Sequence, residues 1–227
     1  MHYAEYKQAD SSLVREMVEA FPFSAIMVNG DEGPIVAQAP LTFRDGRGPA
    51  GAVEFHLARA NQITASLTPG TPVTLFVYGP GAAISPSWFT ASLPGPHPDR
   101  SKTAPTYNYV SLIVRSRIEH MDDQTLQDQI RDLVLKHEPA GGWRVEELAP
   151  ELWERWRRAI QGYRVEIDTF DLTAKLSHGD VPADKPGVID GLNVRALQDD
   201  KAIAKLIGGY DGTSMSLRAQ LRALRAN

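Results

Sequence analysis

Residues 84–89 read ISPSWF, and after an insert rich in proline and glycine, residues 105–110 read PTYNYV. In both stretches a proline at the end of a strand-like run lies beside hydroxyl side chains and large aromatic rings, and the second adds an amide. Proline fixes the local backbone, and aromatic rings offer flat stacking faces. We therefore expect these two stretches to bind a planar ligand that forms hydrogen bonds and carries an anionic tail.

The segments around these stretches predict the fold. Alternating or β-branched runs predict strands over residues 23–28, 34–43, 52–57, 72–78, 109–118 and 163–172. Helical spacing predicts helices over residues 58–67, 122–136, 148–160 and near 188–192, followed by a helical tail. A turn is predicted at residues 79–81 (GPG). Many short strands with helices inserted late predict an α+β protein, an antiparallel barrel decorated by helices, and argue against a parallel α/β sheet.

The composition is that of a globular protein. The 227 residues are 42% hydrophobic and 23% charged, which is enough apolar material for a sizeable core. The formal net charge of -4 argues against a basic nucleic-acid binder, and the absence of cysteine excludes disulfides and thiolate chemistry. The N-terminus has no apolar signal core, and no apolar run reaches membrane-spanning length. We expect a cytoplasmic protein with no membrane partner.

Residues 55–61 (FHLARAN) lie where a predicted strand meets a predicted helix. Backbone N–H groups at a helix start, together with a guanidinium, form a phosphate site. One hypothesis therefore has Arg59 holding a phosphate, with His56 and Asn61 shaping its surroundings. The same residues also fit a simple helix cap with a surface arginine.

The other candidate residues allow structural alternatives. The serines of residues 84–89 lack the pattern of a nucleophile elbow, and the tryptophan there also fits a core position. The histidines are scattered without metal-ligand spacing, so we assign no metal. Residues 216–225 (SLRAQLRALR) predict an amphipathic helix with leucines on one face and arginines on another. It either docks on the protein through its leucines, which we favour, or contacts nucleic acid or another subunit.

Five motifs together resemble the PaiB family, described as FMN-binding negative transcriptional regulators. The motifs are residues 56–61 (HLARAN), 84–89 (ISPSWF), 105–110 (PTYNYV), 175–177 (KLS) and 187–192 (GVIDGL). They occur in the order seen in that family, and the resemblance runs from about residue 3 to residue 192. Tyr107 stands where the family usually has tryptophan and keeps an aromatic face, and Gln62 stands where it often has proline.

The resemblance implies a flavin-binding split barrel similar to pyridoxamine-phosphate oxidases. It implies a domain over residues 1–192 with a helical extension over 193–227, and a homodimer with FMN at the subunit interface. The residues implied to bind FMN are His56, Arg59, Asn61, Ser85, Pro86, Ser87, Trp88, Tyr107, Asn108, Tyr109, Lys175 and Ser177. The implied function is negative transcriptional regulation, with direct DNA binding left open. The alternatives are an FMN-dependent oxidoreductase and a flavin-free interaction module.

Overall fold

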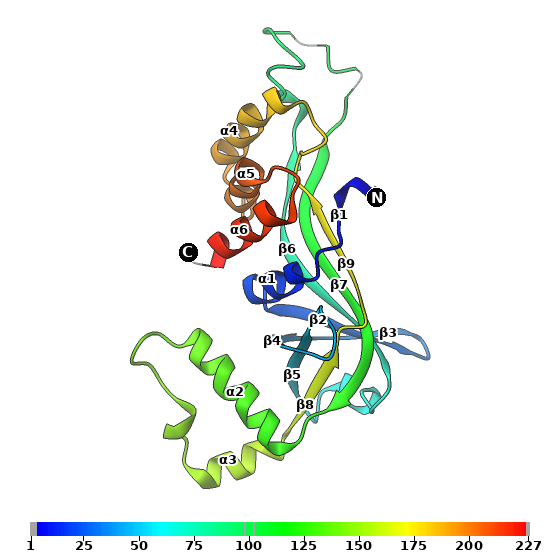
Figure 1. Ribbon diagram of the computed structural model, residues 1–227, viewed down its shortest axis with the longest axis vertical. Coiled ribbons are helices and arrows are strands. Elements are labelled where there is room, and N and C mark those ends of the chain that lie inside the picture. The colour runs from blue at the N-terminus through cyan, green and yellow to red at the C-terminus, as the bar shows by residue number, and fades with distance from the viewer. Residues whose placement is uncertain (1–3, 98, 102, 226–227) are drawn as a thin grey trace. The chain divides into compact units, whose positions relative to one another are not determined.

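The computed structural model describes residues 4–97, 99–101 and 103–225 and divides the chain into two compact units (Figure 1). Unit 1 comprises Met1–Ala20, Tyr78–Leu112 and Asp171–Asn227. Unit 2 comprises Phe21–Val77 and Ile113–Phe170. Because the chain passes between the units several times, neither unit is a continuous segment of sequence.

The structure contains both strands and helices, as an α+β protein requires. The strands are β1 (Lys7–Gln8), β2 (Phe23–Gly30), β3 (Gly33–Pro40), β4 (Thr42–Arg44), β5 (Ala52–Ala58), β6 (Pro72–Ile84), β7 (Thr106–His120), β8 (Ile160–Glu166) and β9 (Thr169–Lys175). The α-helices are α1 (Ser12–Ala20), α2 (Asp123–His137), α3 (Pro150–Arg157), α4 (Lys185–Arg195), α5 (Asp200–Gly209) and α6 (Ser214–Arg225). The 3₁₀ helices are η1 (Ala4–Tyr6), η2 (Gln62–Ser66), η3 (Pro86–Trp88), η4 (Val145–Glu147) and η5 (Pro182–Asp184).

Unit 2 is built on a sheet in the order β3-β2-β6-β7-β8-β5-β4. The β2–β3, β2–β6, β4–β5, β5–β8 and β7–β8 pairs are antiparallel. Phe55 of β5 faces Tyr163 of β8 in register, and their stacked rings lie 5.2 Å apart within the core. The predicted antiparallel α+β class is confirmed, but this order of strands ends at β3 and β4, so the described strands do not close into a barrel.

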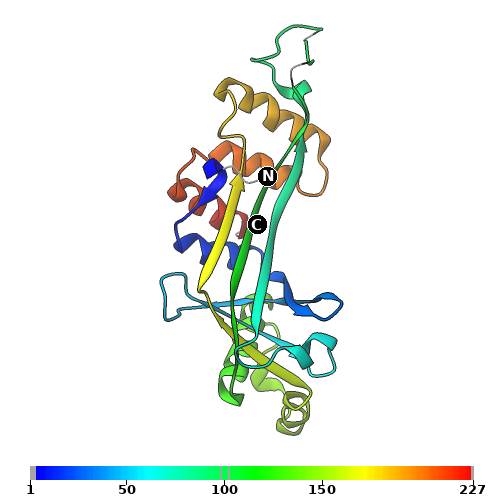
Figure 2. The ribbon, with the colours of Figure 1, turned by 90° about the vertical axis from the view of Figure 1, so that its right-hand side faces the viewer.

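Unit 1 places one face of a sheet against helices. Its sheet joins β6, β7, β9 and β1, and the β1–β9 pair is antiparallel. Figure 2 shows α1, α4, α5 and α6 behind this sheet, all on one side. Buried apolar side chains fill the space between the layers. They include Leu13, Met17, Val110, Leu112, Leu172, Leu192, Ile203, Leu206, Leu217 and Leu221.

The predicted turn at residues 79–81 is wrong, because β6 continues through it to Ile84. The two glycines serve close packing instead. A Cβ at Gly79 would lie 2.5 Å from the carbonyl oxygen of Val110, and one at Gly81 would lie 2.6 Å from the Tyr107 ring. Both contacts are closer than real Cβ atoms make, so glycine here lets β7 approach β6 rather than reversing the chain.

Three other predicted elements differ from the structure. The strand predicted over residues 34–43 is two strands, β3 and β4, which are interrupted at Leu41. The helix predicted over residues 58–67 is only the 3₁₀ helix η2, because β5 extends to Ala58 and Asn61 then caps the shorter helix. The strand predicted over residues 163–172 is two strands, β8 and β9, which are interrupted at residues 167–168. Apolar side chains fall on odd positions through Ile167 and on even positions from Phe170, so the alternation changes phase at the break, and a prediction that followed this shift would have divided the strand.

Candidate functional site

A buried polar pair lies in unit 1 where β7 and β9 are neighbours. Asn108 Nδ2 donates a hydrogen bond of 2.7 Å to Ser177 Oγ, and the two residues are 1% and 4% exposed. Ser177 lies two residues after Lys175, the last residue of β9, and has a left-handed φ of 57°. Such a conformation is unusual for a residue other than glycine, and it marks the strand end as a functional candidate.

Lys175 adds a cation to this part of unit 1. The residue is 8% exposed, its Nζ donates to Thr106 Oγ1, and it lies 5.7 Å from the centre of the Tyr6 ring. A buried ammonium needs polar or aromatic partners, because an isolated charge in an apolar interior is costly. Ammonium, amide and hydroxyl groups so close together form a donor-rich cluster, which we call the β7–β9 cluster (Thr106, Asn108, Lys175 and Ser177).

The stretch over residues 84–89 forms the short helix η3. Ser85 caps it, because its Oγ accepts a hydrogen bond of 3.2 Å from the Ser87 backbone N–H. Pro86 is buried, and Arg100 donates to Ser87 Oγ at 2.6 Å. Ser85 and Pro86 therefore set the backbone at the end of β6, while Ser87 is exposed beside an arginine.

Trp88 packs on α4 of the same unit. A Cβ at Gly191 would lie 2.3 Å from the Trp88 ring, so only glycine allows this contact. The Arg195 guanidinium lies 4.9 Å from the ring centre and donates to the Asp200 carboxylate at 2.6 and 2.8 Å. Hydrogen bonds from Arg195 are the largest cause of the lowered pKa of Asp200. Residues 84–89 and 187–192 are thus brought together by direct packing.

The aromatic residues of β7 alternate with Asn108. Successive side chains of a strand point to opposite faces, so Tyr107 and Tyr109 lie on the face away from the Asn108 amide. Tyr107 is 54% exposed, and Tyr109 is half-buried. The structure therefore joins Asn108 to Ser177 but does not place the two tyrosines in the same cluster.

His56 and Asn61 lie in unit 2. His56 Nδ1 is 2.8 Å from Gln129 Oε1, and Gln129 Nε2 donates to Thr42 Oγ1 at 3.0 Å. Asn61 Oδ1 accepts a 3.2 Å bond from the Ile63 backbone N–H, which makes Asn61 the cap of η2. The imidazole is thus held by a buried amide, and the Asn61 oxygen is used locally.

Arg59 follows β5 and is exposed. Its backbone N–H donates to the Ala159 carbonyl at 2.8 Å, and its Nε donates to the Arg158 carbonyl at 3.1 Å. Within the described ranges of the chain, Nη1 and Nη2 make no further bond. The bond from Nε orients the guanidinium and leaves its terminal donors for an anion, which fits a phosphate group.

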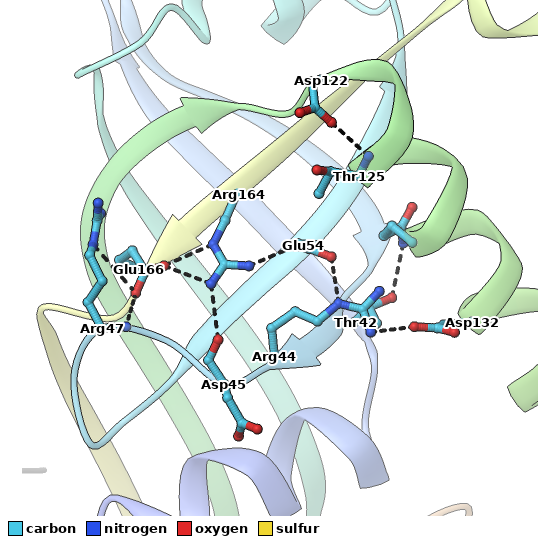
Figure 3. Close-up of polar contacts among 11 residues, drawn as sticks. Thr42, Arg44, Asp45, Arg47, Glu54, Asp122, Thr125, Asp132, Arg164 and Glu166 are labelled. Carbon is cyan, nitrogen blue, oxygen red and sulfur yellow. Dashed lines mark hydrogen bonds and ion pairs between the residues drawn. The ribbon is translucent and has the colours of Figure 1, made fainter.

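An ionic network on β4, β5 and β8 was not predicted (Figure 3). Arg164 donates at 2.8 Å to both Glu54 and Glu166, and Arg44 donates to Glu54 at 2.7 Å. Burial alone would raise the pKa of Glu166, but bonds from the Arg47 backbone N–H and the Arg164 guanidinium outweigh burial and lower it. Carboxylates held in the charged form by arginines are structural groups and poor proton donors.

The comparisons with known proteins identify the family. The model of the family described as "Putative FMN-binding domain" matches residues 1–169, so the chain belongs to this family. The PAI 2 protease synthase and sporulation protein of Bacillus subtilis (strain 168) is 21% identical over 204 residues, covering 89% of this chain and 93% of that protein. The predicted PaiB family is therefore confirmed.

Two solved structures share the fold. The flavocytochrome Anf3 from Azotobacter vinelandii has a TM-score of 0.57 and 18% identity, with 77% of this chain and 71% of that chain covered. A FAD and heme binding protein from Mycobacterium smegmatis has a TM-score of 0.51 and 13% identity, with 75% and 73% covered.

FMN is the cofactor of this chain, as the sequence predicts, because the chain belongs to a family of FMN-binding domains. The donors present suit it. In unit 2, Arg59 offers an oriented guanidinium for the phosphate group. Among the described residues, no group of histidine, aspartate and glutamate could hold a metal, and no helix is long and apolar enough to cross a membrane.

Proposed function

We propose that this chain is a homodimeric flavin-binding split-barrel protein of the PaiB type that acts as a negative transcriptional regulator, with FMN bound at the subunit interface. The twelve residues named from the family resemblance are the proposed residues of the FMN site, with His56 and Asn61 shaping the surroundings of the phosphate rather than bonding it. Bound flavin supplies electron-transfer chemistry, and the protein's residues bind and orient it. Arg59 is the observation that carries the FMN-binding part of the proposal, because its guanidinium is oriented and has terminal donors to spare; the regulatory role and the dimer rest on the family resemblance.

Substitution of Arg59 tests this proposal. The Arg59→Ala variant should bind FMN much more weakly and riboflavin almost normally, because riboflavin lacks the phosphate. Arg117→Ala is the matched control, since Arg117 is another exposed arginine of unit 2 that donates to a backbone carbonyl, that of Gly70. Equal losses for FMN and riboflavin in Arg59→Ala would show that Arg59 does not contact the phosphate.

The proposed regulatory role does not use the arginines of α6. Arg218 donates to Asp10, and Arg222 and Arg225 bond the Glu16 carboxylate, all within unit 1. These arginines already neutralise acidic groups, which leaves them little attraction for nucleic acid. Regulation would then act through another surface or through a partner protein. Salt-dependent DNA binding that disappears when residues 214–225 are deleted from a folded protein would contradict this.

The homodimer is tested separately. Light scattering at micromolar concentration should give twice the mass of one chain, and removal of FMN should leave the protein more prone to dissociate. A monomer that binds FMN tightly would contradict an interface site.

An FMN-dependent oxidoreductase is the second candidate, and one observation favours it. Tyr107 is 54% exposed, so its ring is open to solvent. If Tyr107 contacts the flavin, a reductant could approach from the solvent side. We expect the FMN-loaded protein to oxidise NADH and NADPH only weakly. Steady oxidation at rates typical of enzymes would make the oxidoreductase the favoured function.

A further inference from the structure

A cavity in unit 2 is lined by aromatic and aliphatic side chains. Its volume is about 350 Å³, which is within the range of small-molecule sites. The lining residues are His56, Ile130, Trp143, Val145, Leu148, Trp153, Trp156, Ala159 and Ile160. They come from β5, α2, η4, α3, β8 and the adjoining loops, so several segments of unit 2 converge on it.

The tryptophans around this cavity are not part of the packed core. No residue of α3 is buried, and Trp156 and Trp143 are 48% and 41% exposed. Tryptophan normally buries most of its large surface. Three tryptophans around one open cavity are therefore unusual for a close-packed core. Their rings offer apolar faces on which a planar molecule can stack.

His56 contributes the imidazole to a lining that is otherwise almost wholly apolar. Gln129 is fully buried and donates through Nε2 to Thr42, so its Oε1 accepts from His56 Nδ1–H at 2.8 Å. A proton on Nδ1 leaves Nε2 as an acceptor. The buried amide therefore fixes the imidazole in a form that can receive one hydrogen bond from a ligand.

We propose that this cavity binds a small, uncharged, planar aromatic molecule that carries one hydrogen-bond donor, such as a phenol or an indole. The aromatic part stacks on the tryptophans, and its donor bonds to His56. A cationic ligand fits less well, because none of the nine lining residues is a carboxylate and an uncompensated charge would lose its hydration. The flavin ring also fits less well, because its pyrimidine edge carries several polar atoms that need partners.

The probe for the test is 2-naphthol, which is planar, neutral at neutral pH and has one hydroxyl donor. The full-length, FMN-loaded protein is titrated calorimetrically with 2-naphthol and with 2-methoxynaphthalene, which keeps the rings but lacks the donor. We expect one site per chain and tighter binding of 2-naphthol. Trp156→Ala should weaken 2-naphthol binding about tenfold or more, through lost stacking and apolar burial.

Two further variants separate the contributions. Phe23→Ala, which removes another exposed aromatic side chain of unit 2 outside the cavity, should bind 2-naphthol normally. His56→Leu should bind 2-naphthol and 2-methoxynaphthalene with nearly equal affinity, because the acceptor is lost while the apolar lining is kept. Circular dichroism and melting curves establish that each variant is folded.

Several results would overturn this inference. One is the absence of 2-naphthol binding by the folded wild-type protein; another is unchanged binding by folded Trp156→Ala. Tighter binding of benzyltrimethylammonium than of 2-naphthol would show that the site selects cations. Loss of 2-naphthol binding when FMN is added to the FMN-free protein would show that the cavity belongs to the flavin. FMN affinity itself is measured in parallel, so failure here is distinguishable from failure of the proposed function.

Discussion

Helices α3 and α6 are both amphipathic and both carry arginines, yet only α6 is packed into its unit. Leu217 and Leu221 of α6 are fully buried, whereas no residue of α3 is buried. The arginines of α6 bond carboxylates of α1 and of the residues just before it, and Arg157 of α3 bonds both Glu154 of its own helix and Asp123 of α2, so the difference between the helices lies in their apolar burial. Amphipathicity therefore predicts a helix but does not predict whether a complementary surface covers it.

The surface that covers α6 is acidic and apolar at once. Glu16 of α1 is 2% exposed and receives bonds from Arg222 and Arg225. Exposed ion pairs contribute little to the free energy of unfolding. Removing the partner of a buried carboxylate costs more, because it leaves an uncompensated charge. α6 is therefore held by both its leucines and its arginines. The tryptophans of α3 instead surround an open cavity.

Deletion of residues 214–225 should have the largest effect on this comparison. It exposes the surface that covered Leu217 and Leu221. Because the burial of these two leucines is lost, the free energy of unfolding should fall by about 3–6 kcal/mol. It also leaves Glu16 without its two arginines. The expected result is a strongly lowered melting temperature, measured by circular dichroism. An unchanged melting temperature would show that α6 is not structural.

Leu221→Ala should lower the free energy of unfolding by about 2–5 kcal/mol, because it opens a cavity in a packed region. Urea denaturation followed by circular dichroism gives this value. The matched control is Leu135→Ala in α2, because Leu135 is 60% exposed and its truncation opens no cavity. Equal losses in the two variants would contradict the packing of α6 described here.

Trp156→Ala should lower the free energy of unfolding by less than Leu221→Ala does, although it removes a larger side chain. The reason is that Trp156 is 48% exposed and lines a cavity rather than a packed core. The same urea denaturation tests it. A loss as large as that of Leu221→Ala would mean that α3 is packed as tightly as α6.

The smallest expected effect is a pH dependence of the melting temperature that comes from Asp211, just before α6. Hydrogen bonds from the Ser216 and Thr213 hydroxyls and the Thr213 backbone N–H lower the pKa of Asp211 from 3.8 to about 2. Because its pKa is lower in the folded state, the charged Asp211 carboxylate stabilises the folded protein. This stabilisation is fully present above pH 3.8 and is lost as the pH falls through about 2.

Comparison of the wild-type protein with Asp211→Asn isolates this effect. The difference between their melting temperatures should be constant above pH 4 and should shrink below it. A difference that stays constant down to pH 2 would show that the Asp211 carboxylate does not stabilise the helix start.

Local patterns predicted most elements but not their limits or their contacts. The leucine stripe of residues 216–225 correctly indicated a docked helix, α6, whose Leu217 and Leu221 are buried. The glycines of residues 79–81 led to the wrong prediction of a turn, because glycine occurs both in turns and where strands pack closely. Only the positions of Val110 and Tyr107 in the folded protein decide between the two. The Glu54–Arg164 pair had no local signal, since 110 positions separate its members.

The sequence by itself determined the family, the FMN cofactor, the antiparallel α+β class and the amphipathic helices. All of these depend on ordered motifs or on the periods of strands and helices, which are local properties. Only the tertiary structure decided which groups meet. Arg222 and Glu16 are 206 positions apart, and Asn108 and Ser177 are 69 apart. Such pairs depend on how the elements pack, and the same packing buries the leucines of α6 while leaving the tryptophans of α3 around a cavity.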